Sequence, residues 1–380
     1  MNIRSLKQPD KRVESNYDSR LDIQAYGYNN LYPQQALAVV MASPNGRQCL
    51  ARYAKFVEGD GLQDKALADT VVNRYHQTMR DLHHLVARDL AYFGGFALHL
   101  NYNTEGLIVE IQHEPFENCR LEECDDDGYV ARIVTHPDWN GKATRNGRRL
   151  LVDNERVERI DVFAPHHVLA QIESVGGIGY YDGQIQWNSI SGWRRYPTTK
   201  YDSVLTDLST DEGLSNVRNR NVRNNFLPAG MLITKRGSQI EGETVSDTGY
   251  SGDLVQFQGD ANALKLLEVE VDITEEAPEF KTIESLNTDK MYTATTESVI
   301  DNIYSAFNQE VFLSLRRGKV GFSGDLVRDA WDDYAAQVRE EQNFISSAYA
   351  KVFAYWAGEQ FTDFTILSCR FGGTQNANYE

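Results

Sequence analysis

The spacing of apolar positions changes several times along the chain, and each change predicts a different type of element. Apolar residues recur at helical spacing over 33–57, with a soft point at 43–46. A stronger helical pattern covers 63–93 and stops at Gly94 and Gly95, because glycine tolerates the backbone conformation that ends a helix. The N-terminal part is therefore predicted to be helical.

From residue 96 the period becomes two, which is typical of strands with one buried face. Two segments, 96–102 and 107–111, are predicted to form a hairpin joined through 103–106. Further short alternating segments follow, with turn residues between them: 129–134, 149–152, 157–163 and, as an additional candidate, 167–172. We expect a meandering β region here.

Helical periodicity returns at residue 201. One helix is predicted over 201–226 and another over 286–313, and the residues between them, 226–285, alternate like strands. A further apolar stripe over 324–356 predicts a single helix of roughly 50 Å, and a strand over 361–371 is predicted after it. Together these patterns predict an α+β fold without internal repeats.

Charge is the part of the composition that changes this picture. The chain has 55 Asp and Glu against 38 Lys and Arg, a formal net charge of −17, which argues against tight binding of nucleic acid through its phosphates. A hydrophobic content of 41% argues against wholesale disorder, and four scattered cysteines are too few for a disulfide scaffold. No apolar run reaches the roughly 18 residues of a membrane span, and 1–17 lacks the apolar core of a secretory signal.

Two cysteines and two histidines are the nearest approach to a metal site in the sequence. Cys119 and Cys124 lie near His113 and His136 in sequence, but their spacing is wider than in zinc sites and no second cysteine pair follows. Two isolated thiols in or between strands are the favoured interpretation, and no metal site is predicted.

Two loops were considered for ion or phosphate binding. The acidic run 125–127 before Gly128 is more typical of a tight turn, because the further ligand positions of a calcium loop are absent. The glycines of 176–179 do not follow the spacing of a phosphate-binding loop. No catalytic motif is present, so we predict no catalytic residue, no cofactor and no enzyme.

Two basic clusters stand out against the acidic background. The loop cluster consists of Arg316, Arg317 and Lys319, in a glycine-rich stretch between two predicted helices. The helix-end cluster consists of Arg218, Arg220, Arg223, Lys235 and Arg236. Both are compatible with ordinary charges that complement a helix dipole and with a solvated loop. The functional alternative is transient contact with phosphates.

Four segments give the chain a resemblance to portal proteins of tailed bacteriophages. The segment 22–33 (DIQAYGYNNLYP) resembles the N-terminal opening of that family, and FVEGDGL at 56–62 follows a helix as it does there. The segment 196–228 is similar to the region where the first stem helix meets the clip. The block 286–358 is similar to the second stem helix, tunnel loop and following wing helix.

The resemblance implies a portal-type fold with an α/β wing, a two-helix stem, a small β-rich clip and a reduced or absent crown. The implied parts are a flexible arm (1–20), wing (21–200), first stem helix (201–225), clip (226–285), second stem helix (286–313), tunnel loop (314–323), and the long wing helix with the C-terminal strand (324–380).

The function implied by the resemblance is a DNA conduit. Twelve copies would form a ring at a unique capsid vertex of the virion, after assembly in the host cytoplasm, and double-stranded DNA would pass through it during packaging and ejection. The implied partners are other copies of the chain, DNA, the terminase large subunit, a head–tail connector or adaptor and the major capsid protein, with no membrane. Net acidity suits a conduit because tight phosphate binding would stop the DNA from sliding.

Two alternatives remain open at this point. Another structural virion protein, such as a connector or minor capsid component, would share the acidity and the oligomerisation but not the stem–clip–stem order. A hydrolase or nucleotide-binding enzyme would need one of the motifs that are missing.

Overall fold

The computed structural model describes the following residues: 16–142, 144–145, 148–149, 151–190, 195–223, 231–235, 267–271, 288–318 and 324–371. They form helices and strands in a mixed arrangement, so the predicted α+β class is confirmed. The chain divides into two compact units. The first combines residues 1–205 with 303–380, and the second consists of residues 206–302.

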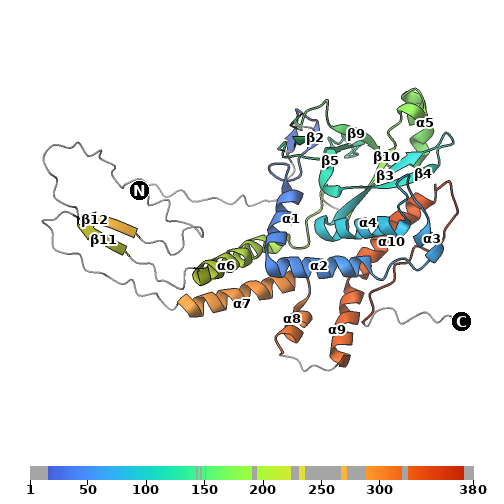
Figure 1. Ribbon diagram of the computed structural model, residues 1–380. Coiled ribbons are helices and arrows are strands. Elements are labelled where there is room, and N and C mark those ends of the chain that lie inside the picture. Colours follow the sequence, from blue (N-terminus) through green and yellow to red (C-terminus); the bar gives the residue numbers. More distant parts are fainter. Residues whose placement is uncertain are drawn as a thin grey trace, which may run out of the picture. The chain divides into compact units, whose positions relative to one another are not determined.

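An eight-stranded sheet forms the centre of the first unit (Figure 1). In spatial order its strands are β1 (Tyr17–Asp18), β2 (Ile23–Gln24), β5 (Cys119–Glu122), β6 (Arg132–Thr135), β9 (Glu158–Val162), β10 (Gln184–Ser189), β3 (Gly95–Tyr102) and β4 (Ile108–Glu114). Only the β9–β10 pair is parallel among these neighbours. A separate short pair joins β7 (Thr144–Arg145) to β8 (Arg148–Arg149).

The predicted hairpin is confirmed as β3 and β4, which pair from Ala97 with Glu114 to Tyr102 with Ile108. The prediction of a strand at 167–172 is wrong, because this stretch forms helix α5 (Val168–Ser174) after a 3₁₀ turn at Pro165–His167. Proline suits the first turn of a helix, since its fixed φ matches and its missing N–H would have no partner there.

Helices α1 (Tyr32–Ala42) and α2 (Pro44–Glu58) divide at the predicted soft point. Ser43 caps α2 by accepting a hydrogen bond from the Gly46 amide at 2.9 Å. Helix α4 lies against β3, and α2 and α10 lie against α4 (Figure 1).

The single helix predicted over 63–93 is wrong. The chain instead forms α3 (Lys65–Asp69), a turn, and α4 (Met79–Phe93). The turn is closed by a bridge between Val71 and Thr78, and Thr78 with Asp81 forms a capping box that starts α4. Gly94, with a φ of +77°, ends α4 as predicted.

The second unit contains two long helices and a pair of strands. Helices α6 (Leu205–Arg223) and α7 (Thr288–Ala306) run side by side in opposite directions (Figure 1). Hydrogen bonds connect Arg218 to Thr296 and Asn302 to Asp207, both at 3.3 Å. Strands β11 (Met231–Lys235) and β12 (Leu267–Val271) pair in parallel. The alternating stretch 254–257 lies outside the described residues.

Two further helices that the apolar pattern predicts as continuous are broken. The helix over 286–313 divides into α7 and α8 (Glu310–Arg316), with Asn308 at a φ of +54° between them. The helix over 324–356 divides at Val338 into α9 (Gly324–Gln337) and α10 (Arg339–Phe353), and Figure 1 shows the change of direction. Val338 is fully buried, so the apolar stripe continues through the break.

The predicted strand at 361–371 is an extended segment with one bridge, between Ile366 and Leu62. The Leu367 amide donates to the Gly61 carbonyl at 2.8 Å, and the Gln63 amide donates to the Thr365 carbonyl at 2.9 Å. In the part of the chain that the structure describes, no helix has the length and apolar character needed to cross a membrane.

Candidate functional site

Two of the segments that carry the family resemblance, 22–33 and 196–228, contact each other in the structure. The ring of Tyr26 stacks on Tyr196, with centroids 4.1 Å apart, and on Tyr32, with centroids 5.3 Å apart. The Tyr26 hydroxyl donates to the Pro197 carbonyl at 2.7 Å, and the Tyr196 hydroxyl donates to the Gln24 carbonyl at 2.6 Å. These aromatic residues therefore hold the start of α1 to the segment that leads into α6.

Arg120 on β5 lies next to this aromatic cluster and is fully buried. Its guanidinium lies over the rings of Trp139, at 4.8 Å, and Tyr26, at 5.6 Å. It also donates to the Cys119 carbonyl at 2.7 Å and to both oxygens of Asn30, with 2.7 Å to the carbonyl. Burial lowers the pKa of Arg120 to about 10, which leaves the side chain charged at neutral pH.

Several polar contacts fix the segment just before α6 within the first unit. The Tyr32 hydroxyl donates to Asp202 at 2.7 Å, and the Tyr53 hydroxyl donates to Glu341 at 2.7 Å. Lys200 forms an ion pair with the same Glu341 at 3.7 Å. The residues from which α6 starts are thus connected to α1, α2 and α10.

Two members of the loop cluster, Arg316 and Arg317, lie within the described residues and are adjacent in sequence. Arg316 ends α8 and is exposed, with one terminal nitrogen 3.2 Å from the Tyr304 hydroxyl and 3.4 Å from the Asn45 side-chain oxygen. Arg317 is partly exposed in the turn that follows, and Gly318 has a φ of +66°. Lys319 lies outside the described residues. The cluster therefore begins at the end of a short helix rather than within a long loop.

The helix-end cluster is divided between elements. Arg218 is exposed on α6, while Arg220 and Arg223 lie in the last turns of that helix. Lys235 ends β11, and Arg236 lies outside the described residues. The first half of α6 carries Asp207, Asp211 and Glu212, so negative charge precedes positive charge along this helix. This order complements the helix dipole.

The residues considered for a metal site have other partners. His113 contacts the Asp89 carboxylate at 2.7 Å, and His136 accepts a hydrogen bond from the Asp138 amide at 3.0 Å. Cys119 is buried, and burial raises the pKa of its thiol well above the ordinary value. Within the described residues, no group of three or more His, Cys, Asp or Glu side chains has a metal-binding arrangement.

The acidic run forms a turn, as predicted. The Asp125 side chain accepts hydrogen bonds from the amides of Tyr129, at 2.8 Å, and Asp127, at 3.1 Å. Gly128 has a φ of +82°, which glycine tolerates more readily than other residues.

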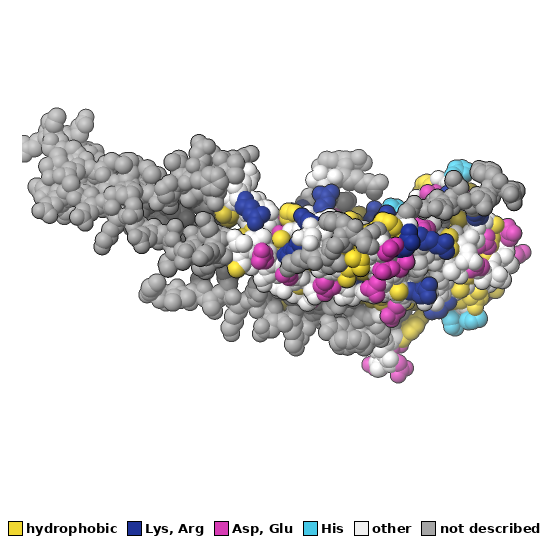
Figure 2. All heavy atoms as spheres, turned by 90° about the horizontal axis from the view of Figure 1, so that it is seen from below, with side chains coloured by type: hydrophobic (Ala, Val, Ile, Leu, Met, Phe, Trp, Pro, Cys, Tyr) yellow, Lys and Arg dark blue, Asp and Glu magenta, His cyan; other side chains and the backbone are white. Residues whose placement is uncertain are grey.

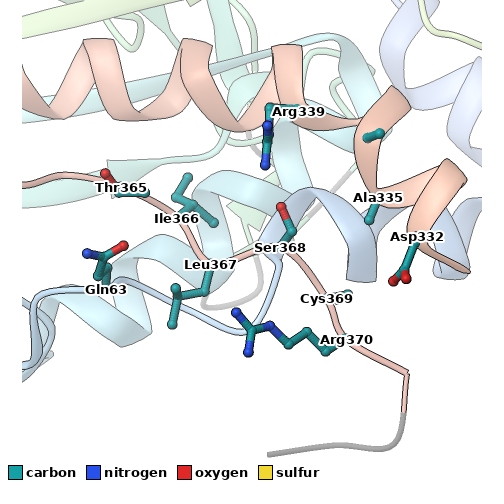
Figure 3. Close-up of a pocket in the computed structure, with 11 residues that line it drawn as sticks. Gln63, Asp332, Ala335, Arg339, Thr365, Ile366, Leu367, Ser368, Cys369 and Arg370 are labelled. Carbon is teal, nitrogen blue, oxygen red and sulfur yellow. The ribbon is translucent and has the colours of Figure 1, made fainter.

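An open pocket of about 410 Å³ lies between the α9–α10 bend and the extended C-terminal segment. Figure 3 shows Arg339 pointing towards the backbone of Ile366 and Ser368, with Asp332 on the α9 side. Cys369 also lines it, but burial raises the pKa of its thiol to about 11, so the thiol stays protonated at neutral pH. This lining has no activated nucleophile.

Charges of both signs are interspersed on the face shown in Figure 2, among exposed apolar side chains. The described residues on that face do not gather into one broad basic surface, in keeping with the acidic composition. A protein that holds nucleic acid by neutralising many phosphates needs such a surface.

Comparisons with known proteins found similar solved structures and no match by sequence. No protein-family model matches the sequence, and no curated protein matches it. The structure is similar to a chain of the virion of a native gene transfer agent particle, with a TM-score of 0.46, 14% identity, and coverage of 86% of this chain and 82% of the other.

Two more structures show the same kind of likeness. A chain from the neck of an empty gene transfer agent particle gives a TM-score of 0.48 and 14% identity, covering 86% of this chain and 82% of the other. An HK97-family phage portal protein from Corynebacterium diphtheriae gives a TM-score of 0.31 and 14% identity, covering 72% of this chain and 75% of the other.

Proposed function

We propose that this chain is the subunit of a phage portal ring, located at a unique capsid vertex of the virion, through which double-stranded DNA passes during packaging and ejection. The observation that carries the proposal is the order of the two units along the chain. An α/β unit is interrupted by 206–302, which begins with α6, contains a β pair and ends with α7. A stem that leads to a clip and back requires this order.

The same order supports an assignment of parts. Helices α6 and α7 are the stem, within 201–225 and 286–313. The intervening residues, 226–285, are the clip and include β11 and β12. The tunnel loop is 314–323, which begins within the last turn of α8 and ends before α9, and the remaining residues of the first unit form the wing.

The electrostatic composition supports a conduit that does not retain its cargo. A net charge of −17 per subunit opposes tight binding to phosphates, while a few arginines can position the DNA. Arg316, Arg317 and Lys319 are the residues proposed to face it. The protein itself performs no chemistry in this proposal. The terminase large subunit supplies the packaging motor at the clip and is later replaced by a head–tail connector, and the major capsid protein surrounds the wing.

Electron microscopy of the purified chain tests the proposal. The expected result is a closed, twelve-fold ring with a central channel wide enough for B-form DNA, with heterologous contacts between neighbours. A gold label attached near β11 should appear at one end of the ring, arranged closely around the channel axis. A monomer at every protein concentration would contradict the proposal, and a ring with the label at its outer rim would favour a different structural virion protein.

A further inference from the structure

Gln309 joins three helices of the first unit through one side chain. Its amide nitrogen donates to the Cys49 carbonyl of α2 at 3.0 Å and to the Tyr334 hydroxyl of α9 at 2.9 Å. Its amide oxygen accepts from Arg52, also on α2, at 2.8 Å. Gln309 is fully buried, and all three bonds lie within the same unit.

The position of Gln309 along the chain gives these bonds a particular effect. Gln309 directly precedes α8, after Asn308, whose φ of +54° breaks the helix. The Tyr334 hydroxyl donates in turn to the carbonyl of Phe307 at 3.1 Å. The break between α7 and α8 is therefore held from both sides by hydrogen bonds to α2 and α9.

Residues 317–323, which belong to the basic loop predicted from the sequence, lie between α8 and α9 along the chain, so Gln309 connects the helices on both sides of them to α2. Arg52 strengthens this connection, because its guanidinium also lies over the Phe312 ring of α8 at 4.6 Å. We infer that Gln309 is a positioning residue that fixes both helices flanking the basic loop relative to α2. The anchoring follows from the bonds described, whereas its consequence for DNA rests on the proposed function.

The buried amide is a sensitive anchor because its three hydrogen bonds all reach other helices. If Gln309 is replaced by an apolar side chain, the Cys49 carbonyl, the Arg52 guanidinium and the Tyr334 hydroxyl each lose a partner. The loss of these bonds weakens the attachment of α8 and α9 to α2, so local opening of these helices becomes more frequent.

Gln342 on α10 offers a matched control. It is also buried, and its amide nitrogen also donates to an α2 carbonyl, that of Phe56, at 2.9 Å. Its amide oxygen accepts from the Ser368 hydroxyl at 3.3 Å, and it contacts neither helix that flanks the loop through these bonds. The variants Gln309→Met and Gln342→Met therefore remove equivalent side chains with different connections.

Hydrogen exchange measured by mass spectrometry on the assembled full-length protein tests the anchoring. In Gln309→Met, peptides covering α8 and the α9 turns around Tyr334 should exchange about tenfold faster than in the wild type. Gln342→Met should leave these peptides within about twofold of the wild type and accelerate those of α10 and 365–370 instead. Equal exchange of α8 in the wild type and Gln309→Met would overturn the inference.

A milder variant covers the case in which Gln309→Met does not fold. Tyr334→Phe keeps the ring and removes the hydroxyl that joins Gln309 to the Phe307 carbonyl, so α8 peptides should again exchange faster, by a smaller factor. Unchanged α8 exchange in this variant would overturn the inference as well. In particles, Gln309→Met should alter genome retention in the same direction as loss of the loop cations. If α8 peptides exchange faster but genome retention is unchanged, the anchoring by Gln309 stands and the proposed contact of the loop with DNA is wrong.

Discussion

Tyr201 and Phe307 stack on each other, with ring centroids 6.0 Å apart and ring planes 23° apart. Tyr201 precedes α6 and Phe307 follows α7, so the stack joins the two points at which the chain leaves and re-enters the first unit. Both residues are fully buried, and the Tyr201 hydroxyl donates to the Tyr92 carbonyl at 3.0 Å. The two chain segments that flank the second unit are thus packed in the core of the first unit.

Truncation of this stack should be strongly destabilising. We expect Phe307→Ala to lower the free energy of unfolding by about 3–5 kcal/mol, because it removes a buried aromatic ring and leaves a cavity. Urea unfolding at a fixed protein concentration measures this. Tyr28→Ala is the control, since Tyr28 is 75% exposed and its loss should change stability by less than about 0.5 kcal/mol. Equal effects of the two variants would show that the stack does not contribute.

Removal of the loop cations should separate assembly from DNA handling. The triple variant Arg316→Ala, Arg317→Ala and Lys319→Ala should form rings like the wild type and change the amount of nuclease-resistant DNA in particles several-fold. The reason is that these residues are proposed to contact phosphates and not the neighbouring subunits.

The control for this variant removes the same charge from other exposed sites. Lys65, Arg88 and Lys351 are exposed on α3, α4 and α10, and their replacement by Ala should leave DNA content unchanged. If the loop variant fails to form rings, the loop is structural and its assignment as a DNA-facing element is wrong.

Glu110 on β4 should stabilise the protein most at neutral pH and less in acid. Its carboxylate accepts from Arg74 at 2.6 and 2.9 Å and from Asn101 at 2.9 Å, and the bonds from Arg74 above all lower the pKa of Glu110 to about 2. The ordinary value, about 4.5, applies to the unfolded chain. The stabilisation is therefore present above about pH 4.5 and is lost as the pH falls towards 2.

The variant Glu110→Gln tests this dependence. It should lower the free energy of unfolding at pH 7 by about 1–2 kcal/mol, because Arg74 is largely exposed and solvent screens the pair. Its unfolding free energy should also change less than that of the wild type between pH 4.5 and 2. Parallel pH curves for the two proteins would refute the prediction.

Glu114 lies on the same strand and should have the opposite effect. Burial raises its pKa to about 7, with further contributions from the negative charges of Glu158 and Asp89, while His113 acts in the other direction. The folded state therefore favours the protonated carboxyl. Its contribution is present below about pH 4.5 and is lost as the pH rises through about 7.

Glu114→Gln should accordingly flatten the dependence of the melting temperature on pH between 4.5 and 7. Above pH 7 the variant should melt at a higher temperature than the wild type, because the neutral amide avoids burying a charge. A variant that melts lower than the wild type at pH 8 would contradict this prediction.

Elements with local signals could be predicted from the sequence. The hairpin of β3 and β4 followed from its alternation and its turn residues, and the division between α1 and α2 followed from Pro44 after a capping serine. Gly94 ended α4 where expected. In each case the signal lies within a few residues of the feature, so no distant partner is needed to decide it.

The breaks in the long helices could not be predicted in the same way. Val338 stays buried on the apolar stripe, so the pattern continues across a bend that other helices impose. The α7–α8 break depends on Gln309 and Tyr334, whose partners lie in other helices. Polar residues at such positions are indistinguishable in sequence from exposed ones.

The sequence by itself determined the acidic charge and the α+β class, because these depend on composition and on periods of two and 3.6 residues. Only the tertiary structure decided that Arg120 is buried among aromatic rings and that Gln309 connects α2, α8 and α9. Burial and hydrogen bonding of a polar side chain depend on which distant segments meet around it. That meeting is a property of the packed chain, which no local pattern of residues specifies.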